Sequence, residues 1–124
     1  MSDSPTETVK KFCDAWSDND LDALMIFFAD DAVYHNIPID PVTGVDAIKA
    51  TIAGFTQGVE KIEFRVNNIA ADGDTVLTER VDVFHLPGNT IELPVMGTFE
   101  VKDGKITAWR DYFDMQQFMS QMQS

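Results

Sequence analysis

The chain has 124 residues, of which 44% are apolar and nine are Phe, enough to build one domain around one hydrophobic core. Its 21 acidic residues outnumber its 9 basic ones, and the formal net charge of -12 disfavours binding to nucleic acids and to anionic membranes. The single cysteine, Cys13, excludes an internal disulfide and a cysteine-rich zinc site. The N-terminus is acidic and polar, unlike a secretory signal, and no apolar run could span a bilayer, so we expect a cytoplasmic protein.

The first half of the chain has the residue spacing of helices. Ser4 and Glu7 form a capping-box pattern ahead of an apolar stripe, which predicts a helix over about residues 5–17. Asp20 can cap a second helix that continues to about Phe28. The other elements expected in this half are an extended segment at residues 32–37 and a third helix that starts near Val45 and ends before Gly58.

The second half changes to the two-residue alternation of β-strands. Four segments rich in β-branched residues are separated by glycine-containing turns, which is the pattern of an antiparallel meander joined by hairpins. Helices followed by a curved, mainly antiparallel sheet predict a single α+β domain over residues 1–124, with helices covering one sheet face. The strands are expected at residues 60–71, 74–86, 90–101 and 105–114, and a last helix at residues 115–122.

Charged side chains occur in the middle of two of these strands. Arg80 and Asp82 are two residues apart, so they point to the same face of their strand as Phe84. On the last strand, Asp111 shares a face with Trp109. A consistent inward face then holds one guanidinium and two carboxylates among five apolar side chains, which are Phe84, Leu93, Val95, Trp109 and Phe113.

This charged cluster has two interpretations. A buried structural ion pair, or a reversed assignment of the sheet faces, would give the cluster no chemical role. In a functional pocket, one Arg cannot neutralise two carboxylates, so one carboxyl pKa is expected to rise while the Arg holds the other down. A protonated carboxyl would then lie opposite a carboxylate. That pair suits a reaction in which one atom receives a proton while water attacks another.

Five segments carry a resemblance to a known family: YHN at 34–36, ERVDVF at 79–84, LPVMGTFE at 93–100, GKI at 104–106 and WRDYFD at 109–114. Together they resemble the limonene-1,2-epoxide hydrolase family. That family belongs to the superfamily of nuclear transport factor two and ketosteroid isomerase, whose cystatin-like fold is a cone-shaped α+β roll. The resemblance runs from about residue 16 to residue 114, and it implies this fold for the chain.

The resemblance also implies a role for each polar residue at a matching position. Asp82 would protonate the epoxide oxygen, Asp111 would take a proton from the attacking water, and Arg80 would bridge the two carboxylates. Tyr34 and Asn36 would hold the same water. The implied enzyme adds water to a small apolar epoxide in one step, without cofactor, metal or covalent intermediate, and is a homodimer. The side chains expected to bind substrate are Phe84, Leu93, Val95, Trp109 and Phe113.

Two other functions fit the sequence. An isomerase or cyclase of the same superfamily would use one Asp to move a proton beside a carbonyl, and it would not need an Arg between two acids. A non-catalytic ligand-binding module would keep the three charges as a structural network.

Three further patterns receive structural interpretations. His35 and His85 have no partners at metal-ligand spacing and are interpreted as structural histidines. The stripe of Met115, Met119 and Met122 with Phe118 predicts packing or a lid. The outer sheet face is half apolar, which is typical of a dimer contact, and its apolar residues are Val81, Val83, Ala108 and Tyr112.

Overall fold

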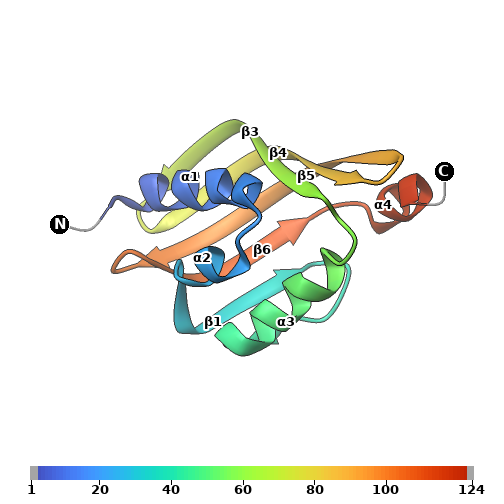
Figure 1. Cartoon of the computed structure of the whole chain (residues 1–124). Coiled ribbons are helices and arrows are strands. Elements are labelled where there is room, and N and C mark those ends of the chain that lie inside the picture. Colours follow the sequence, from blue (N-terminus) through green and yellow to red (C-terminus); the bar gives the residue numbers. More distant parts are fainter. Residues whose placement is uncertain (1–2, 123–124) are drawn as a thin grey trace.

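In the computed structural model, which describes residues 3–122, the chain begins with helix α1 (Pro5–Ala15) (Figure 1). The Ser4 side chain accepts a hydrogen bond from the Glu7 backbone amide, and the Glu7 carboxylate accepts one from the Ser4 amide. The predicted capping box is therefore confirmed. A short 3-10 turn, η1 (Trp16–Asp18), follows the helix. The apolar stripe of α1, including Phe12, faces the core.

The second helix is shorter than predicted. Helix α2 (Leu21–Met25) starts at its Asp20 cap, whose carboxylate accepts a hydrogen bond from the Ala23 amide at 3.2 Å. The predicted continuation to Phe28 is wrong, because Phe28 begins strand β1 (Phe28–Asn36). A short apolar run fits either a helix or a buried strand. Here pairing with β6 makes the segment a strand. Strand β1 is also longer than the extended segment predicted at residues 32–37.

The sheet has six strands in the order β2-β1-β6-β5-β4-β3. The last four strands form the predicted antiparallel meander, with a glycine of positive φ in each hairpin turn. Strand β1 adds to the meander in parallel to β6, and the two-residue strand β2 (Val42–Thr43) pairs with β1. Periodicity predicts a strand but not its neighbour, so the parallel pair was not foreseen. The meander strands are β3 (Lys61–Asp72), β4 (Thr75–Leu86), β5 (Asn89–Lys102) and β6 (Lys105–Tyr112).

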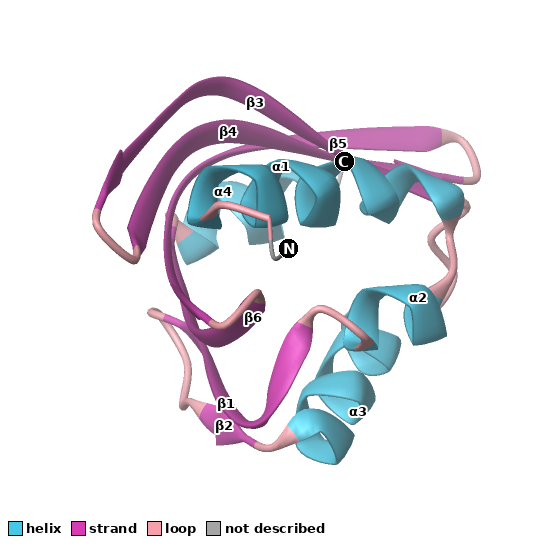
Figure 2. Ribbon diagram, turned by 90° about the vertical axis from the view of Figure 1, so that its left-hand side faces the viewer, coloured by secondary structure: helices cyan, strands magenta, loops and turns pink. Residues whose placement is uncertain are grey.

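The sheet curls around the helices, so that its concave face encloses the core (Figure 2). Helix α1 lies inside the curve against β3, and helix α3 (Val45–Phe55) packs on β1. Between them, the Trp109 ring lies 5.1 Å from that of Phe12 and 4.3 Å from that of Tyr34. The predicted α+β architecture, with helices on one face of a curved, mainly antiparallel sheet, is confirmed. No helix within residues 3–122 is long and apolar enough to cross a lipid bilayer.

Candidate active site

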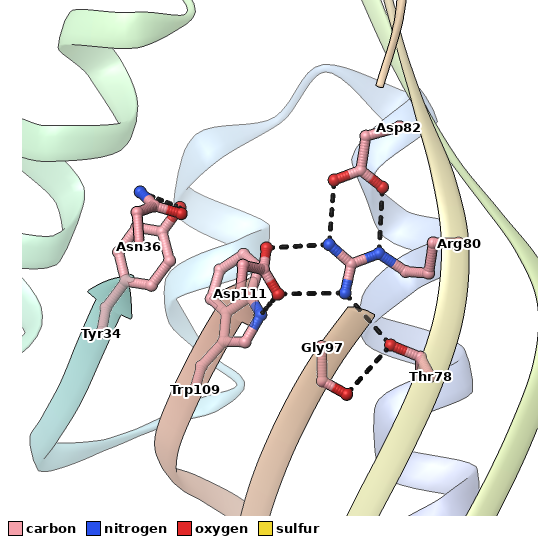
Figure 3. A network of polar contacts seen from close by, with 8 residues as sticks. All are labelled: Tyr34, Asn36, Thr78, Arg80, Asp82, Gly97, Trp109 and Asp111. Carbon is pink, nitrogen blue, oxygen red and sulfur yellow. Dashed lines mark hydrogen bonds and ion pairs between the residues drawn. The ribbon is translucent and has the colours of Figure 1, made fainter. Parts of the chain in front are cut away.

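Arg80, Asp82 and Asp111 meet on the concave face of the sheet (Figure 3). Arg80 Nε and Nη2 donate to the two Asp82 carboxylate oxygens at 2.9 and 2.8 Å. Nη1 and Nη2 donate to the two Asp111 oxygens at 3.2 and 2.8 Å. Arg80 is 1% exposed and each Asp is 4% exposed. Strands β4 and β6 thus direct their charges to one interior face, as their alternation predicted, and the guanidinium bridges both carboxylates.

Burial shapes the charge state of this cluster. Removal from water raises the pKa of Asp82 to about 6, although the Arg80 cation opposes the rise, and the Asp111 charge adds to it. Burial alone would lower the pKa of Arg80, but Asp111 and Asp82 outweigh it and raise that pKa further, so Arg80 stays cationic. The sequence interpretation put repulsion between the carboxylates first, whereas desolvation is the larger cause at Asp82.

The two carboxyl groups differ in their hydrogen bonds. Asp111 accepts two bonds from Arg80 and a third from Trp109, whose Nε1 lies 2.6 Å from Asp111 Oδ1. Within the described part of the chain, Asp82 accepts only its two bonds from Arg80. Donors directed at a carboxylate favour its charged form. With its raised pKa and its smaller number of donors, Asp82 is the carboxyl group suited to hold a proton.

Trp109 lies in a different place from the one predicted for it. The sequence placed it in the pocket wall, but its side chain is fully buried in the core and is not among the lining residues. Its ring stacks on Tyr34 at 4.3 Å and on Phe99 at 5.5 Å. The prediction that Trp109 points inward is confirmed. Its indole lies in the core, where it donates to Asp111, and it does not face the cavity.

Tyr34 and Asn36 lie beside Asp111 because β1 pairs with β6, with Asn36 in register with Asp111. The Tyr34 hydroxyl oxygen is 2.9 Å from Asn36 Nδ2 and 3.1 Å from Asn36 Oδ1. Burial raises the pKa of Tyr34, so its phenol stays neutral. A hydroxyl, an amide and a carboxylate from two neighbouring strands thus gather at one place, where they can hold a small polar molecule by several hydrogen bonds (Figure 3).

A cavity of about 130 Å³ opens in front of both carboxylates. Asp82 and Asp111 line it, and so do four of the five predicted apolar residues, namely Phe84, Leu93, Val95 and Phe113. Helix α4 (Met115–Met122) contributes Met115 and Phe118 to the wall, whereas Met119 and Met122 of the predicted stripe are 49% and 50% exposed. The lining residues that the sequence did not assign to the pocket are Ile39, Thr51, Phe55, Phe64, Met115 and Phe118.

Phe64 is the most informative of these additional residues. Its ring centroid lies 4.5 Å from the Arg80 guanidinium carbon, which is the geometry of a cation–π contact. The Phe64 ring also stacks on the Trp16 ring, with a distance of 4.4 Å between the ring centroids. Phe64 pairs in register with Asp82, so knowledge of the β3–β4 register would have placed it on the same face.

Helix α4 is hydrogen-bonded to β5 through Gln121, whose backbone carbonyl accepts from the Asn89 side chain at 3.0 Å. The Gln121 amide oxygen accepts from the Glu92 backbone amide at 2.9 Å, and the Gln121 amide nitrogen donates to the Glu92 carbonyl at 2.8 Å. These two bonds reproduce those of a paired strand along β5. They hold Met115 and Phe118 of the helix over the cavity.

The histidines lie outside this cluster. His85 Nε2 is 2.7 Å from Glu63 Oε2, a pairing between β4 and β3 that the sequence did not predict. Among residues 3–122, no group of three or more His, Cys, Asp and Glu side chains is arranged to hold a metal ion.

Comparison with known proteins identifies the family. The model of the limonene-1,2-epoxide hydrolase catalytic domain matches residues 3–124. Epoxide hydrolase EphG of Mycobacterium tuberculosis is 38% identical over 107 residues, which are 86% of this chain and 71% of that protein. The chain belongs to the limonene-1,2-epoxide hydrolase family. Both the predicted family and the predicted class of enzyme, an epoxide hydrolase of this type, are confirmed.

Solved structures support the same assignment. The structure of an LEH-like epoxide hydrolase from M. tuberculosis is 34% identical, with a TM-score of 0.82 over 96% of this chain and 90% of that one. A protein from Shewanella denitrificans that is named as a SnoaL-like polyketide cyclase has a TM-score of 0.85 over 96% of each chain, at 18% identity. The cyclase shares the fold alone, which is that of the nuclear transport factor two superfamily.

Replacing either tryptophan by Phe tests the bond to Asp111. Trp109→Phe removes a hydrogen bond to a buried charged group, whereas the Nε1 of Trp16 has no hydrogen-bond partner within the described residues. Both side chains are buried and both variants lose the same ring volume. We expect Trp109→Phe to lower the free energy of unfolding by about 1.5–3 kcal/mol more than Trp16→Phe. If urea denaturation gives the same decrease in the free energy of unfolding for both variants, the role given to this hydrogen bond is wrong.

Proposed function

We propose that this enzyme adds water to a small apolar epoxide in one step and releases a vicinal diol, without a covalent intermediate. The observation that carries the proposal is the buried Arg80 bridge, which joins two carboxyl groups of unequal environment in front of an apolar cavity. A proton donor and a proton acceptor at a shared site are what epoxide opening by water requires.

Asp82 acts as the general acid in this proposal. Its raised pKa, about 6, keeps a proton available near neutral pH for the epoxide oxygen. Asp111, favoured as the anion by its third hydrogen bond, acts as the general base. As the carbon–oxygen bond of the strained ring breaks, the oxygen takes the Asp82 proton and the attacking water gives one to Asp111. The charge of the cluster is the same before and after, and one proton must return from Asp111 to Asp82 before the next turnover.

Tyr34 and Asn36 orient the attacking water. Both side chains line the cavity next to Asp111, and the neutral phenol can donate to or accept from a water molecule. Holding water in line with the base makes a poor nucleophile effective. Acid at the oxygen and base at the water each typically contribute about 10²–10⁴ in rate. Both acting at once make an ester to the enzyme unnecessary.

The volume of the cavity limits the size of the part of the substrate that it can enclose. Its wall is predominantly apolar, and its volume is about 130 Å³. An engineered apolar protein cavity of about 150 Å³ binds benzene. The part of the substrate that enters the pocket is therefore about the size of one six-membered ring, with the epoxide directed at Asp82 and Asp111.

Proton transfer beside a carbonyl, as in an isomerase or cyclase, explains fewer features of the site. Such a reaction needs one carboxylate base and an oxyanion donor. It gives no role to a guanidinium that engages both Asp82 and Asp111 with four hydrogen bonds.

A single turnover of cyclohexene oxide in heavy-oxygen water tests the one-step mechanism. With enzyme in excess over substrate, we expect the first diol formed to contain one heavy oxygen, because the nucleophile is solvent water. An ester intermediate would instead deliver an unlabelled carboxylate oxygen in the first turnover. Mass spectrometry of the diol distinguishes the two routes.

The Asp111→Asn variant is the control for that experiment. It keeps the shape of the side chain but removes the base, so turnover should fall by about 10²–10⁴ while the circular dichroism spectrum is unchanged. If the unmodified enzyme turns over none of a panel of cycloalkene, styrene-type and terpene oxides, the proposed function is wrong.

The pH dependence of kcat/KM tests the acid. The active form of Asp82 is the neutral carboxyl, which predominates below its pKa, so kcat/KM should fall as pH rises through about 6. Asp82→Asn should lose about 10²–10⁴ in rate together with this decline at high pH. An Asp82→Asn variant that keeps the same decline would show that another group is responsible.

We also propose that the enzyme is a homodimer formed through the outer sheet face. Leu77, Met96 and Tyr112 remain 46%, 51% and 47% exposed there, and Met96 pairs in register with Tyr112. Exposed apolar side chains grouped on neighbouring strands favour contact with an identical face related by a twofold axis.

A charge placed on this face should separate the subunits. Met96→Glu would bury a carboxylate at the twofold contact, so we expect a monomer in sedimentation velocity where the unmodified protein is a dimer. Ile26→Glu is the matched control, because Ile26 is 68% exposed and follows α2, away from this face. A dimer that survives Met96→Glu would exclude this surface.

A further inference from the structure

All five N–H groups of the Arg80 guanidinium have an acceptor. Four of them bond to Asp82 and Asp111, and the fifth, on Nη1, donates to Thr78 Oγ1 at 3.1 Å. A guanidinium has five donors in a rigid planar fork, so the direction of one donor restricts the other four. Thr78 thus accepts the one guanidinium N–H bond that the two carboxylates do not. Its side chain is buried, 1% exposed, and does not line the cavity.

The Thr78 hydroxyl is itself held by the neighbouring strand. It donates to the Gly97 carbonyl at 3.3 Å, which leaves its oxygen lone pairs directed to Arg80 (Figure 3). Thr78 and Gly97 are in register on β4 and β5, and Gly97 is in register with Asp111 on β6. The three strands thus align the hydroxyl, the glycine and the carboxylate in one row across the sheet.

Glycine is required at position 97 because the Arg80, Asp111 and Thr78 side chains lie very close to its backbone. A Cβ atom on Gly97 would overlap Arg80 Nη1 and would lie 2.7 Å from Asp111 Oδ1 and 2.9 Å from Thr78 Oγ1. The guanidinium and the Asp111 carboxylate therefore rest directly on the bare backbone of β5. A glycine inside a strand commonly marks such a close approach.

We infer that Thr78 and Gly97 are positioning residues of the reaction, which together fix the rotation of the Arg80 guanidinium and through it the relative placement of the acid and the base. The inference rests on the proposed function for its kinetic consequence. Nη1 is shared between Thr78 and Asp111, so loss of the Thr78 acceptor leaves a buried N–H without a partner. The guanidinium then rotates so that this N–H finds another acceptor. Because the group is rigid, its hydrogen bonds to both carboxylates change at the same time.

Thr78→Val and Thr78→Ser form a matched pair for the test. Valine keeps the branched shape but removes the hydroxyl, whereas serine keeps the hydroxyl. We expect Thr78→Val to lower kcat by roughly 5- to 150-fold, the range of one buried unsatisfied donor, with KM changed less than twofold because Thr78 does not line the cavity. Thr78→Ser should stay within about threefold of the unmodified enzyme. Equal effects of both variants, or none from Thr78→Val, would overturn the inference.

A titration of Asp82 keeps the test independent of turnover. With aspartate labelled at the carboxyl carbon, nuclear magnetic resonance should give the Asp82 pKa at about 6 in the unmodified protein and in Thr78→Ser. In Thr78→Val we expect it to be higher, because the Arg80 cation that opposes the rise is no longer aligned. If no epoxide is hydrolysed but the titration shifts, the proposed function is wrong and the positioning role stands. An unchanged titration in a folded Thr78→Val variant contradicts the positioning role.

Gly97→Ala provides a second variant, with Gly54→Ala as its control. A Cβ on Gly54 would meet nothing within 4 Å, whereas one on Gly97 must displace Arg80. Gly97→Ala should raise the Asp82 pKa in the same direction as Thr78→Val, and Gly54→Ala should leave it unchanged. An Asp82 titration in Gly97→Ala identical to that of Gly54→Ala would also contradict the inference.

Discussion

The interaction on which the site depends is the burial of one guanidinium between two carboxylates. Arg80 is removed from water almost completely, which is costly unless every donor has an acceptor and the charge is balanced. Asp82 and Asp111 supply the balance and four acceptors, and Thr78 supplies the fifth. Two acids facing one cation cannot both be ionised at low cost. The same burial that demands a partner for every donor therefore also raises the pKa of Asp82 to about 6.

The aromatic core has two functions in this arrangement. Phe64 covers the guanidinium and lines the cavity, and Trp109 fills the space behind Asp111 while donating to it. Both rings exclude water from the charges, which strengthens every electrostatic interaction at the site. Exclusion of water is also the first cause of the raised pKa of Asp82. Stability, charge state and the shape of the cavity thus come from the same few side chains.

The fold alone does not explain the chemistry. A SnoaL-like polyketide cyclase at 18% identity has the same architecture with a TM-score of 0.85. A curved sheet with helices in its concave face provides a pocket that different side chains can adapt to different reactions. In this chain, the site is built on the row formed by Thr78, Gly97 and Asp111 across three strands, with Arg80 resting on it.

Local sequence patterns were sufficient for the capping box at Ser4, the meander and the inward direction of Arg80 and Asp82, because turns, caps and two-residue alternation depend on near neighbours. The tertiary structure alone decided that Phe28 begins a strand, since that depends on pairing with β6. It also decided the depth of each inward residue. Alternation indicates a direction but not a depth, so the sequence places Trp109 in the pocket wall although its side chain is buried in the core and donates to Asp111. The part of the wall that α3 supplies through Thr51 and Phe55 depends on helix packing that no local pattern predicts.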